Sequence, residues 1–236
     1  MIWKPDVECA DCDTLRKLQT GRLQQLAAYV YDRCPVYRRK FEQARVHPAD
    51  ITSLDDIRRL PFTTKDDMRD HYPFGLFSVD QRRVAEIHVS SGTTGNPTVV
   101  GYTRDDIGLW SDVMARSFCC TGAQPGDRIQ VAYGYGLFTG GLGMHYGALE
   151  MGLSIIPMSS GQTPRQLKLM YDFGTRILAC TPSYALHMAE EAREAGIDPR
   201  TSPLEIGVFG AEPWTEEMRE QIEQVWNIKA YDIYGL

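Results

Sequence analysis

The chain has 236 residues, of which 43% are hydrophobic, and a formal net charge of −6. This length allows one large domain or two small ones. The acidic balance, without a long basic run, argues against nucleic acid as a partner. No apolar run approaches the roughly 20 residues of a membrane span. The first residues lack the apolar stretch of a secretory signal, so we expect a cytoplasmic protein with no membrane partner.

The six cysteines do not predict a metal or redox centre. Cys9 and Cys12 form a C-x-x-C pair, but no second pair follows and no histidine pair has zinc-finger spacing. The pair opens a helical segment, whereas a redox pair of this type lies near a βαβ unit. We therefore assign no metal ligand, and we expect Cys180, at the end of an apolar run, to be buried.

Residues 1–75 are expected to form a helical segment that packs on the main domain. Apolar residues recur at helical spacing from Leu15 to Val30, and Pro35 ends that helix. Another helix is expected to begin after this proline. Thr64 and Asp67 then have the spacing of a capping box at the start of a short helix. Residues 76–236 are expected to form the second part, an α/β domain.

Residues 90–98 read Ser-Ser-Gly-Thr-Thr-Gly-Asn-Pro-Thr and lie between two apolar, β-branched runs. This pattern predicts a strand, a loop and a second strand. Glycines allow a ligand to approach the backbone, and hydroxyls donate to anionic oxygens, so the loop suits a polyphosphate. It is not a Walker A loop, because the Gly-Lys-Ser/Thr ending and the following helix are absent. An ordinary polar hairpin is the alternative.

Beyond residue 84, short apolar runs alternate with helical patterns about every 25 residues. Strands are expected over residues 128–132, 153–157, 176–180, 204–209 and 228–233, with helices over 165–173, 184–195 and 216–226. This alternation predicts an α/β fold with a mostly parallel sheet flanked by helices. Ligands of such sheets bind at the carboxyl ends of the strands.

The segments that follow these strands are therefore candidate binding loops. Residues 133–143 contain five glycines and three aromatic residues, which we interpret as a loop forming a slot for a flat ligand; a plain surface loop is the alternative. Residues 210–215 begin with Gly210, which permits close approach of the backbone, although a plain strand-to-helix turn also fits. The last strand is followed by residues 234–236.

Together these segments resemble the adenylate-forming superfamily of acyl- and aryl-coenzyme A synthetases, and within it the phenylacetate–coenzyme A ligase family. The motifs lie at residues 90–103, 132–143, 207–215 and 231–236, and residues 60–67 and 180–185 also match. The family's chains run to roughly twice this length. The resemblance implies that a magnesium-binding glutamate, a ribose-binding aspartate and a mobile domain carrying the adenylation lysine lie outside this sequence.

The resemblance implies a two-step reaction with ATP, Mg²⁺ and coenzyme A: phenylacetate is activated to phenylacetyl-AMP and then transferred to the thiol of coenzyme A. It also implies roles for particular residues, although no catalytic residue can be assigned. The phosphate-binding candidates are Ser90, Ser91, Gly92, Thr93, Thr94 and Gly95; the adenine-side candidates are Gly210, Ala211, Glu212, Pro213, Asp232, Ile233 and Tyr234; the aryl-pocket candidates are Tyr133, Phe138, Gly140, Gly141 and Ala211.

Several of these roles have simpler alternatives. Tyr234 is expected to stack on adenine but could be a core tyrosine, and Glu212 could be a solvated carboxylate at a helix start. His145 could contact the substrate carboxylate, although helix packing is favoured, and His88 is interpreted as structural. Asn96 replaces a lysine that is usual in the family, which implies weaker affinity for ATP.

Other functions remain open. A different aryl acid, such as benzoate, hydroxyphenylacetate or indoleacetate, could be the substrate, and the chain could be a non-catalytic module that binds an aryl acid or a nucleotide. A kinase is disfavoured, because the Walker lysine is missing. A parallel sheet that ends at a central strand exposes an edge, so we expect a homodimer or pairing with the missing part of the protein.

Overall fold

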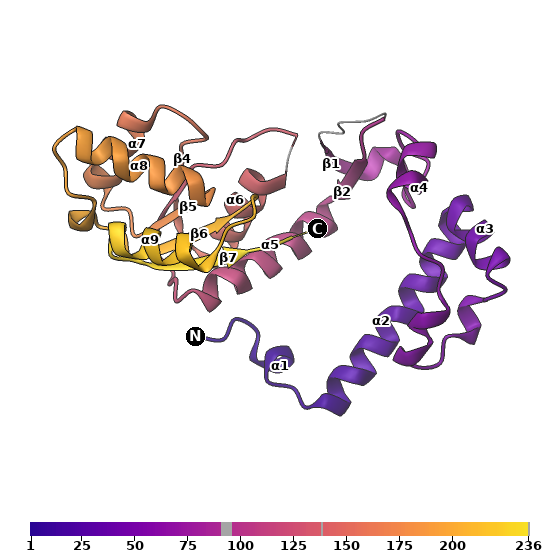
Figure 1. Ribbon diagram of the computed structural model, residues 1–236. Helices are drawn as coiled ribbons and strands as arrows, with labels where there is room; N and C mark the ends of the chain where they lie inside the picture. Colours follow the sequence, from indigo (N-terminus) through magenta and orange to yellow (C-terminus); the bar gives the residue numbers. More distant parts are fainter. Residues whose placement is uncertain (91–95, 138, 236) are drawn as a thin grey trace. The chain divides into compact units, whose positions relative to one another are not determined.

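The computed structural model describes residues 1–90, 96–137 and 139–235 and divides into two compact units (Figure 1). One unit comprises Lys4–Asp106, and the other comprises Met1–Trp3 with Ile107–Leu236. The sequence places the boundary between the two parts after residue 75, whereas the first unit extends to Asp106 because it includes the hairpin that flanks residues 90–98. None of the described helices is both long and apolar enough to cross a bilayer.

The unit formed by residues 4–106 is mostly helical. Its elements are α1 (Pro5–Glu8), α2 (Cys12–Arg33), α3 (Pro35–Gln43), η1 (Pro48–Asp50), η2 (Leu54–Arg59), α4 (Lys65–Asp70), η3 (Gln81–Arg83), β1 (Val84–Val89) and β2 (Val99–Thr103). Pro35 is the first residue of α3, where its missing N–H has no helical partner. A small core of Ala27, Phe41, Val46 and Ile51 holds α2 and α3 to the segment that follows them.

The predicted capping box at α4 is confirmed. The Thr64 hydroxyl accepts a hydrogen bond from the Asp67 N–H, and the Asp67 carboxylate accepts one from the Thr64 N–H, 2.7 Å away. The same carboxylate pairs with Lys40 of α3, whose ammonium also donates to the Phe62 carbonyl at 2.9 Å. These bonds connect α3 to residues 62–67. The hydrogen bond from Lys40 is the main reason that the pKa of Asp67 falls to about 2.

Replacing Asp67 with asparagine is expected to lower the free energy of unfolding by about 1–2 kcal/mol at pH 7. Because folding lowers the Asp67 pKa from 3.8 to about 2, the stabilisation is fully present above pH 4 and disappears as the pH falls towards 2. Urea unfolding followed by circular dichroism from pH 7 down to pH 3 measures this. Asp66→Asn is the control, since the Asp66 side chain is 80% exposed. Equal effects of the two substitutions at every pH would contradict the prediction.

The unit containing residues 107–236 has the predicted α/β fold. Its elements are α5 (Arg104–Cys120, which begins in the first unit), β3 (Arg128–Val131), α6 (Thr139–Met151), β4 (Ser154–Pro157), α7 (Thr163–Phe173), β5 (Ile177–Cys180), α8 (Pro182–Glu194), η4 (Pro199–Thr201), β6 (Ile206–Gly210), α9 (Glu216–Trp226) and β7 (Lys229–Ile233). The five strands lie in the order β4-β3-β5-β6-β7, and all neighbours are parallel.

Helices cover both faces of this sheet. Side chains that alternate along the strands form one core with α7, α8 and α9, including Leu178, Phe209 and the fully buried Trp226. The opposite side chains, such as Val131 and Ala179, form a second core with α5 and α6. Burial on both faces explains why the central strands β5 and β6 read as continuous apolar runs. Cys180 is fully buried, as predicted, and ends β5 at the edge where the strands' carboxyl ends meet.

The expected loop over residues 133–143 is wrong in its second half, because α6 begins at Thr139. Its glycines serve the packing of this helix. A Cβ atom on Gly141 would lie 2.7 Å from the Gly134 carbonyl oxygen, and one on Gly143 would lie 2.6 Å from the Trp110 ring. A larger residue at either position would push α6 away from its neighbours, so these glycines are required by close helix packing.

Candidate functional site

Residues from four strand ends gather at the carboxyl edge of the sheet. Tyr133 follows β3, Cys180 ends β5, Glu212 follows β6 and Asp232 lies near the end of β7. Burial raises the pKa of the Tyr133 phenol far above its ordinary value. Charge repulsion from Cys180, Glu212 and Asp232 adds to this rise, so the phenol lies among groups from the three other strands. This edge is the binding region that the sequence predicts.

The turn after β6 has the tightest backbone geometry of this edge. Gly210 pairs with Ile233 of β7, and a Cβ atom on Gly210 would lie only 2.3 Å from the Ile233 carbonyl oxygen. Ala211 follows with a φ of 68°, in the left-handed region that non-glycine residues rarely adopt. The close approach expected at Gly210 is therefore made to a neighbouring strand, and the turn places Ala211, Glu212 and Pro213 beyond the sheet.

Glu212 connects this turn to α8. Its carboxylate oxygen Oε1 accepts a hydrogen bond of 2.7 Å from the backbone N–H of Ser183. Ser183 lies in the first turn of α8, whose N-cap is Thr181. A carboxylate here satisfies an N–H that has no partner within the helix and interacts favourably with the helix dipole. Glu212 is thus a helix-start carboxylate, but of α8 and not of the helix that follows it.

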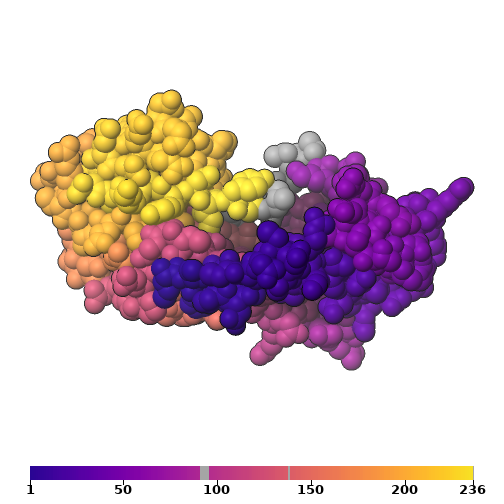
Figure 2. Space-filling view, turned by 90° about the horizontal axis from the view of Figure 1, so that it is seen from below, coloured from indigo at the N-terminus to yellow at the C-terminus, as the bar shows by residue number. Residues whose placement is uncertain are grey.

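Asp232 and Tyr234 lie at the end of β7. The Asp232 carboxylate accepts a hydrogen bond of 2.8 Å from the indole N–H of Trp214. Arg219 of α9 stacks over the same indole, with its guanidinium carbon 4.8 Å from the ring centroid. The Tyr234 side chain is 80% exposed, so it is not a core residue of this chain. Figure 2 shows the carboxyl-terminal residues, in yellow, at the surface of this unit.

The other aryl-pocket candidates differ in their surroundings. Tyr133 is buried, with 7% of its surface exposed. Gly140 and Gly141 lie in the first turn of α6. Phe138 lies outside the described residues. His145, also on α6, has its Nδ1 atom 3.3 Å from the hydroxyl of Tyr135, which lies in the loop after β3.

The predicted strand–loop–strand at residues 84–103 is present as the antiparallel pair β1–β2. At its mouth the Ser90 backbone N–H donates to the Thr98 carbonyl at 3.0 Å, and the Ser90 and Thr98 hydroxyls are also hydrogen-bonded. His88 is buried on β1 and contacts the Glu86 carboxylate at 3.2 Å, which agrees with a structural role. Ser91, Gly92, Thr93, Thr94 and Gly95, the rest of the predicted phosphate loop, lie outside the described residues.

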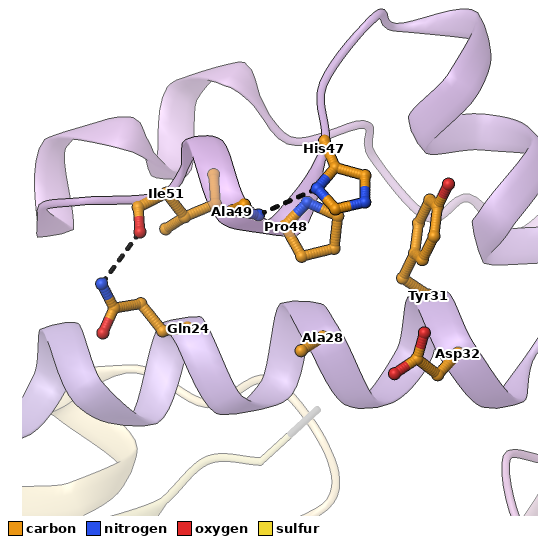
Figure 3. A pocket seen from close by; sticks show the side chains of 8 residues that line it. All are labelled: Gln24, Ala28, Tyr31, Asp32, His47, Pro48, Ala49 and Ile51. Atoms are coloured by element: carbon orange, nitrogen blue, oxygen red, sulfur yellow. Dashed lines mark hydrogen bonds between the residues drawn. The ribbon is translucent and has the colours of Figure 1, made fainter.

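A hollow of about 390 Å³ lies in the unit formed by residues 4–106 (Figure 3). It contains none of the predicted site residues. Two of its polar groups are used within the unit: the Gln24 amide of α2 donates to the Ile51 carbonyl at 2.9 Å, and the His47 ring accepts from the Ala49 N–H at 3.2 Å and so caps η1. We therefore interpret this hollow as a packing feature of the helical unit.

The parallel sheet with helices on both faces defines an α/β protein, a class whose ligands bind beyond the carboxyl ends of the strands. The chain belongs to the AMP-binding enzyme family, whose model matches residues 27–236. It is similar to the phenylacetate-coenzyme A ligases of Pseudomonas putida (52% identity, covering 98% of this chain and 52% of the relative) and Escherichia coli K12 (53% identity, covering 98% and 53%). The chain thus spans about half the length of these curated relatives.

Two solved structures of 2-hydroxyisobutyryl-CoA ligase are similar over the whole chain. The open conformation, in complex with 2-HIB-AMP and CoA, has a TM-score of 0.94 at 31% identity, and the match covers 56% of that chain. The thioesterification state has a TM-score of 0.95 at 32% identity and covers 52% of that chain. The adenylate-forming fold expected from the sequence is therefore confirmed.

Proposed function

We propose that the protein to which this chain belongs activates phenylacetate with ATP and transfers it to coenzyme A. The observation that carries the proposal is the identity of about 50% with phenylacetate-coenzyme A ligases over nearly the whole chain. The arrangement at the carboxyl edge of the sheet supports it, because Tyr133, the turn after Gly210 and the end of β7 lie together there. A cytoplasmic location is part of this proposal.

The proposed reaction has two steps. A carboxylate oxygen of phenylacetate attacks the α-phosphorus of ATP, forming an acyl–phosphate bond and breaking the bond to the β-phosphate, which releases pyrophosphate. The sulfur of coenzyme A then attacks the acyl carbon, forming the thioester and releasing AMP, while the thiol proton passes to a base. Both steps require that charge is balanced and water excluded. This chain's contribution is to bind and orient the acid and the nucleotide.

We assign the individual roles as follows. Tyr133 and Ala211 line the acid, together with Phe138, Gly140 and Gly141. Gly210, Glu212 and Pro213 border the adenine on one side, and Asp232, Ile233 and Tyr234 border it on the other. The loop formed by Ser90, Ser91, Gly92, Thr93, Thr94 and Gly95 holds phosphate oxygens through N–H groups and hydroxyls.

Magnesium is assigned no residue of this chain. Among the described residues there is no group of three or more His, Cys, Asp and Glu side chains arranged to hold a metal ion. The resemblance to adenylate-forming enzymes implies Mg²⁺ as a partner of the ATP phosphates, where it neutralises negative charge. Pairing of the chain with the remaining part of the protein, or homodimerisation, belongs to the same proposal.

The test is release of pyrophosphate from ATP in the presence of phenylacetate. It is measured for this chain alone and for a fusion to the carboxyl-terminal part of the Escherichia coli relative, and we expect turnover only in the fusion. Benzoate, hydroxyphenylacetate and indoleacetate, supplied in parallel, distinguish other aryl acids. A folded fusion that binds ATP but shows no turnover with any of these acids would contradict the proposal and favour a non-catalytic binding module.

A further inference from the structure

A buried amide, Gln166 of α7, holds the loop that follows β4. The side chain is fully buried. Its amide nitrogen Nε2 lies 2.9 Å from the carbonyl oxygens of both Ser159 and Gly161, to which it donates. Its oxygen Oε1 accepts a hydrogen bond of 2.8 Å from the side chain of Gln130, which is also fully buried, in the middle of β3. One side chain therefore connects the sheet, α7 and the loop of residues 158–162.

This loop needs such support because its backbone is unfavourable. Ser159, Gly161 and Gln162 all have positive φ values, of 62°, 82° and 53°. A non-glycine residue in this region costs about 1–3 kcal/mol and persists only where its surroundings impose it. Apart from the amide of Gln166, the Ser159 N–H donates to the Val131 carbonyl at 3.1 Å, at the end of β3. The loop is thus held in place from the sheet and from α7.

The loop of residues 158–162 borders Tyr133 and Gly134, on the side of the candidate site that we propose to bind the acid. A Cβ atom on Gly134, the residue after Tyr133, would lie 3.8 Å from the Ser160 hydroxyl. A shift of the loop would therefore change the space around residues 133 and 134. Because the carboxyl ends of β3 and β4 are neighbours in the parallel sheet, the loop after β4 belongs to the same edge as Tyr133.

The same amide also contacts α8. Gln166 Nε2 lies 3.2 Å from the Tyr184 hydroxyl, which in turn lies 3.0 Å from the Thr163 hydroxyl and donates to the Gly161 carbonyl at 3.3 Å. Tyr184 is in the first turn of α8, beside the Ser183 N–H that donates to Glu212. Neighbouring residues in the first turn of α8 therefore contact the loop after β4, through the Tyr184 hydroxyl, and the turn after β6, through the Ser183 N–H.

We propose that Gln166 is a positioning residue for the acid substrate: its amide fixes the 158–162 loop, which in turn sets the shape of the acid-binding side at Tyr133 and Gly134. This inference rests on the proposed function. Gln166 is too deeply buried to touch substrate itself, so its effect is transmitted through the loop. The affinity for the nucleotide changes less. Only the contact through α8 leads to the turn of residues 210–213, which we propose to border the adenine.

The test is Gln166→Met in the fusion described above, since methionine keeps the length of the side chain and removes the amide. We expect the KM for phenylacetate to rise about tenfold, because loss of the loop's support misplaces the acid. The KM for ATP is expected to change less than about threefold. Backbone amides of residues 158–162 are expected to exchange with deuterium faster. Gln224→Met is the matched control, because Gln224 is exposed on α9.

A second variant, Tyr184→Phe, removes only the hydroxyl that joins the network to α8. We expect a smaller rise in the KM for phenylacetate, of about threefold, and this variant decides the question if Gln166→Met does not fold. Equal changes in both KM values, or an unchanged KM for phenylacetate with faster exchange in the loop, would overturn the inference. Failure of the proposed function appears separately, as lack of phenylacetate-dependent turnover in the unsubstituted fusion. Deuterium exchange of residues 158–162 is then the deciding measurement, and unchanged exchange in Gln166→Met would overturn the inference that Gln166 fixes this loop.

Discussion

The Gly210→Ala variant is expected to lose about 3 kcal/mol of unfolding free energy. The added methyl group would lie 2.3 Å from the Ile233 carbonyl oxygen and 3.0 Å from the Ile233 Cγ2 atom. A backbone atom cannot move aside as a side chain can, so β6 and β7 must separate at their carboxyl ends. Since a domain has only about 5–15 kcal/mol of net stability, this is a large fraction. The turn of residues 210–213, which we propose to border the adenine, would shift with these strands.

Urea unfolding followed by tryptophan fluorescence measures this loss of stability in the unit that contains β6 and β7. All four tryptophans, Trp3, Trp110, Trp214 and Trp226, belong to the unit that contains the sheet. The control is Gly108→Ala in α5, where an added Cβ atom has no neighbour within 4 Å. Alanine favours the helix there, so a gain of about 0.5–1 kcal/mol is expected. Shifts of the same sign and size in both variants would contradict the argument.

The central strands β3, β5 and β6 were predictable from the sequence because they are buried on both faces. Within the predicted strand 176–180, residues 177–180 form an uninterrupted apolar run. The structure places β5 at Ile177–Cys180, with every residue buried. The largest difference in a strand start is at β6, which begins at Ile206 and not at residue 204. Continuous burial leaves a strong signal in the sequence, whereas the ends of strands depend on hydrogen bonds to neighbours that composition does not specify.

Helix α6 was not predictable in the same way. Its sequence contains Gly140, Gly141, Gly143 and Gly147, and each glycine costs about 1 kcal/mol relative to alanine in an isolated helix. The helix forms because these positions allow very close packing: a Cβ atom on Gly147 would lie 2.3 Å from the Met114 side chain of α5. Tertiary packing here overrides local propensity, and a single sequence does not reveal which neighbour the glycines face.

The candidate site shows the same limit. The sequence located the strand ends and the turns after them, but it did not indicate the pairing of Trp214 with Asp232 or the role of Gln166. Gln166 looks like a polar position on an amphipathic helix. Its amide is used by the left-handed loop beside it, because it donates to the carbonyl groups of both Ser159 and Gly161. Such partners are fixed only when the chain is folded.

Tyr234→Ala is expected to raise the KM for ATP by about 5- to 150-fold in the fusion, while leaving the free energy of unfolding nearly unchanged. The first expectation follows from the proposed stacking of this ring on adenine, since aromatic stacking on a base contributes about 1–3 kcal/mol. The second follows from the exposure of the side chain, 80%, which means that little packing is lost on truncation. Tyr234→Ala should therefore change the KM for ATP without changing stability, whereas Gly210→Ala should lower the free energy of unfolding.

Steady-state kinetics with ATP varied at saturating phenylacetate measure the effect, and urea unfolding checks stability. Tyr234→Phe is the matched control: it keeps the ring and removes the hydroxyl, so its KM for ATP should stay within about twofold of the unsubstituted value. If alanine and phenylalanine give the same KM for ATP, the ring does not stack on the nucleotide. If Tyr234→Ala instead destabilises the fold, the tyrosine is a packing residue in the complete protein, which was the alternative left open by the sequence.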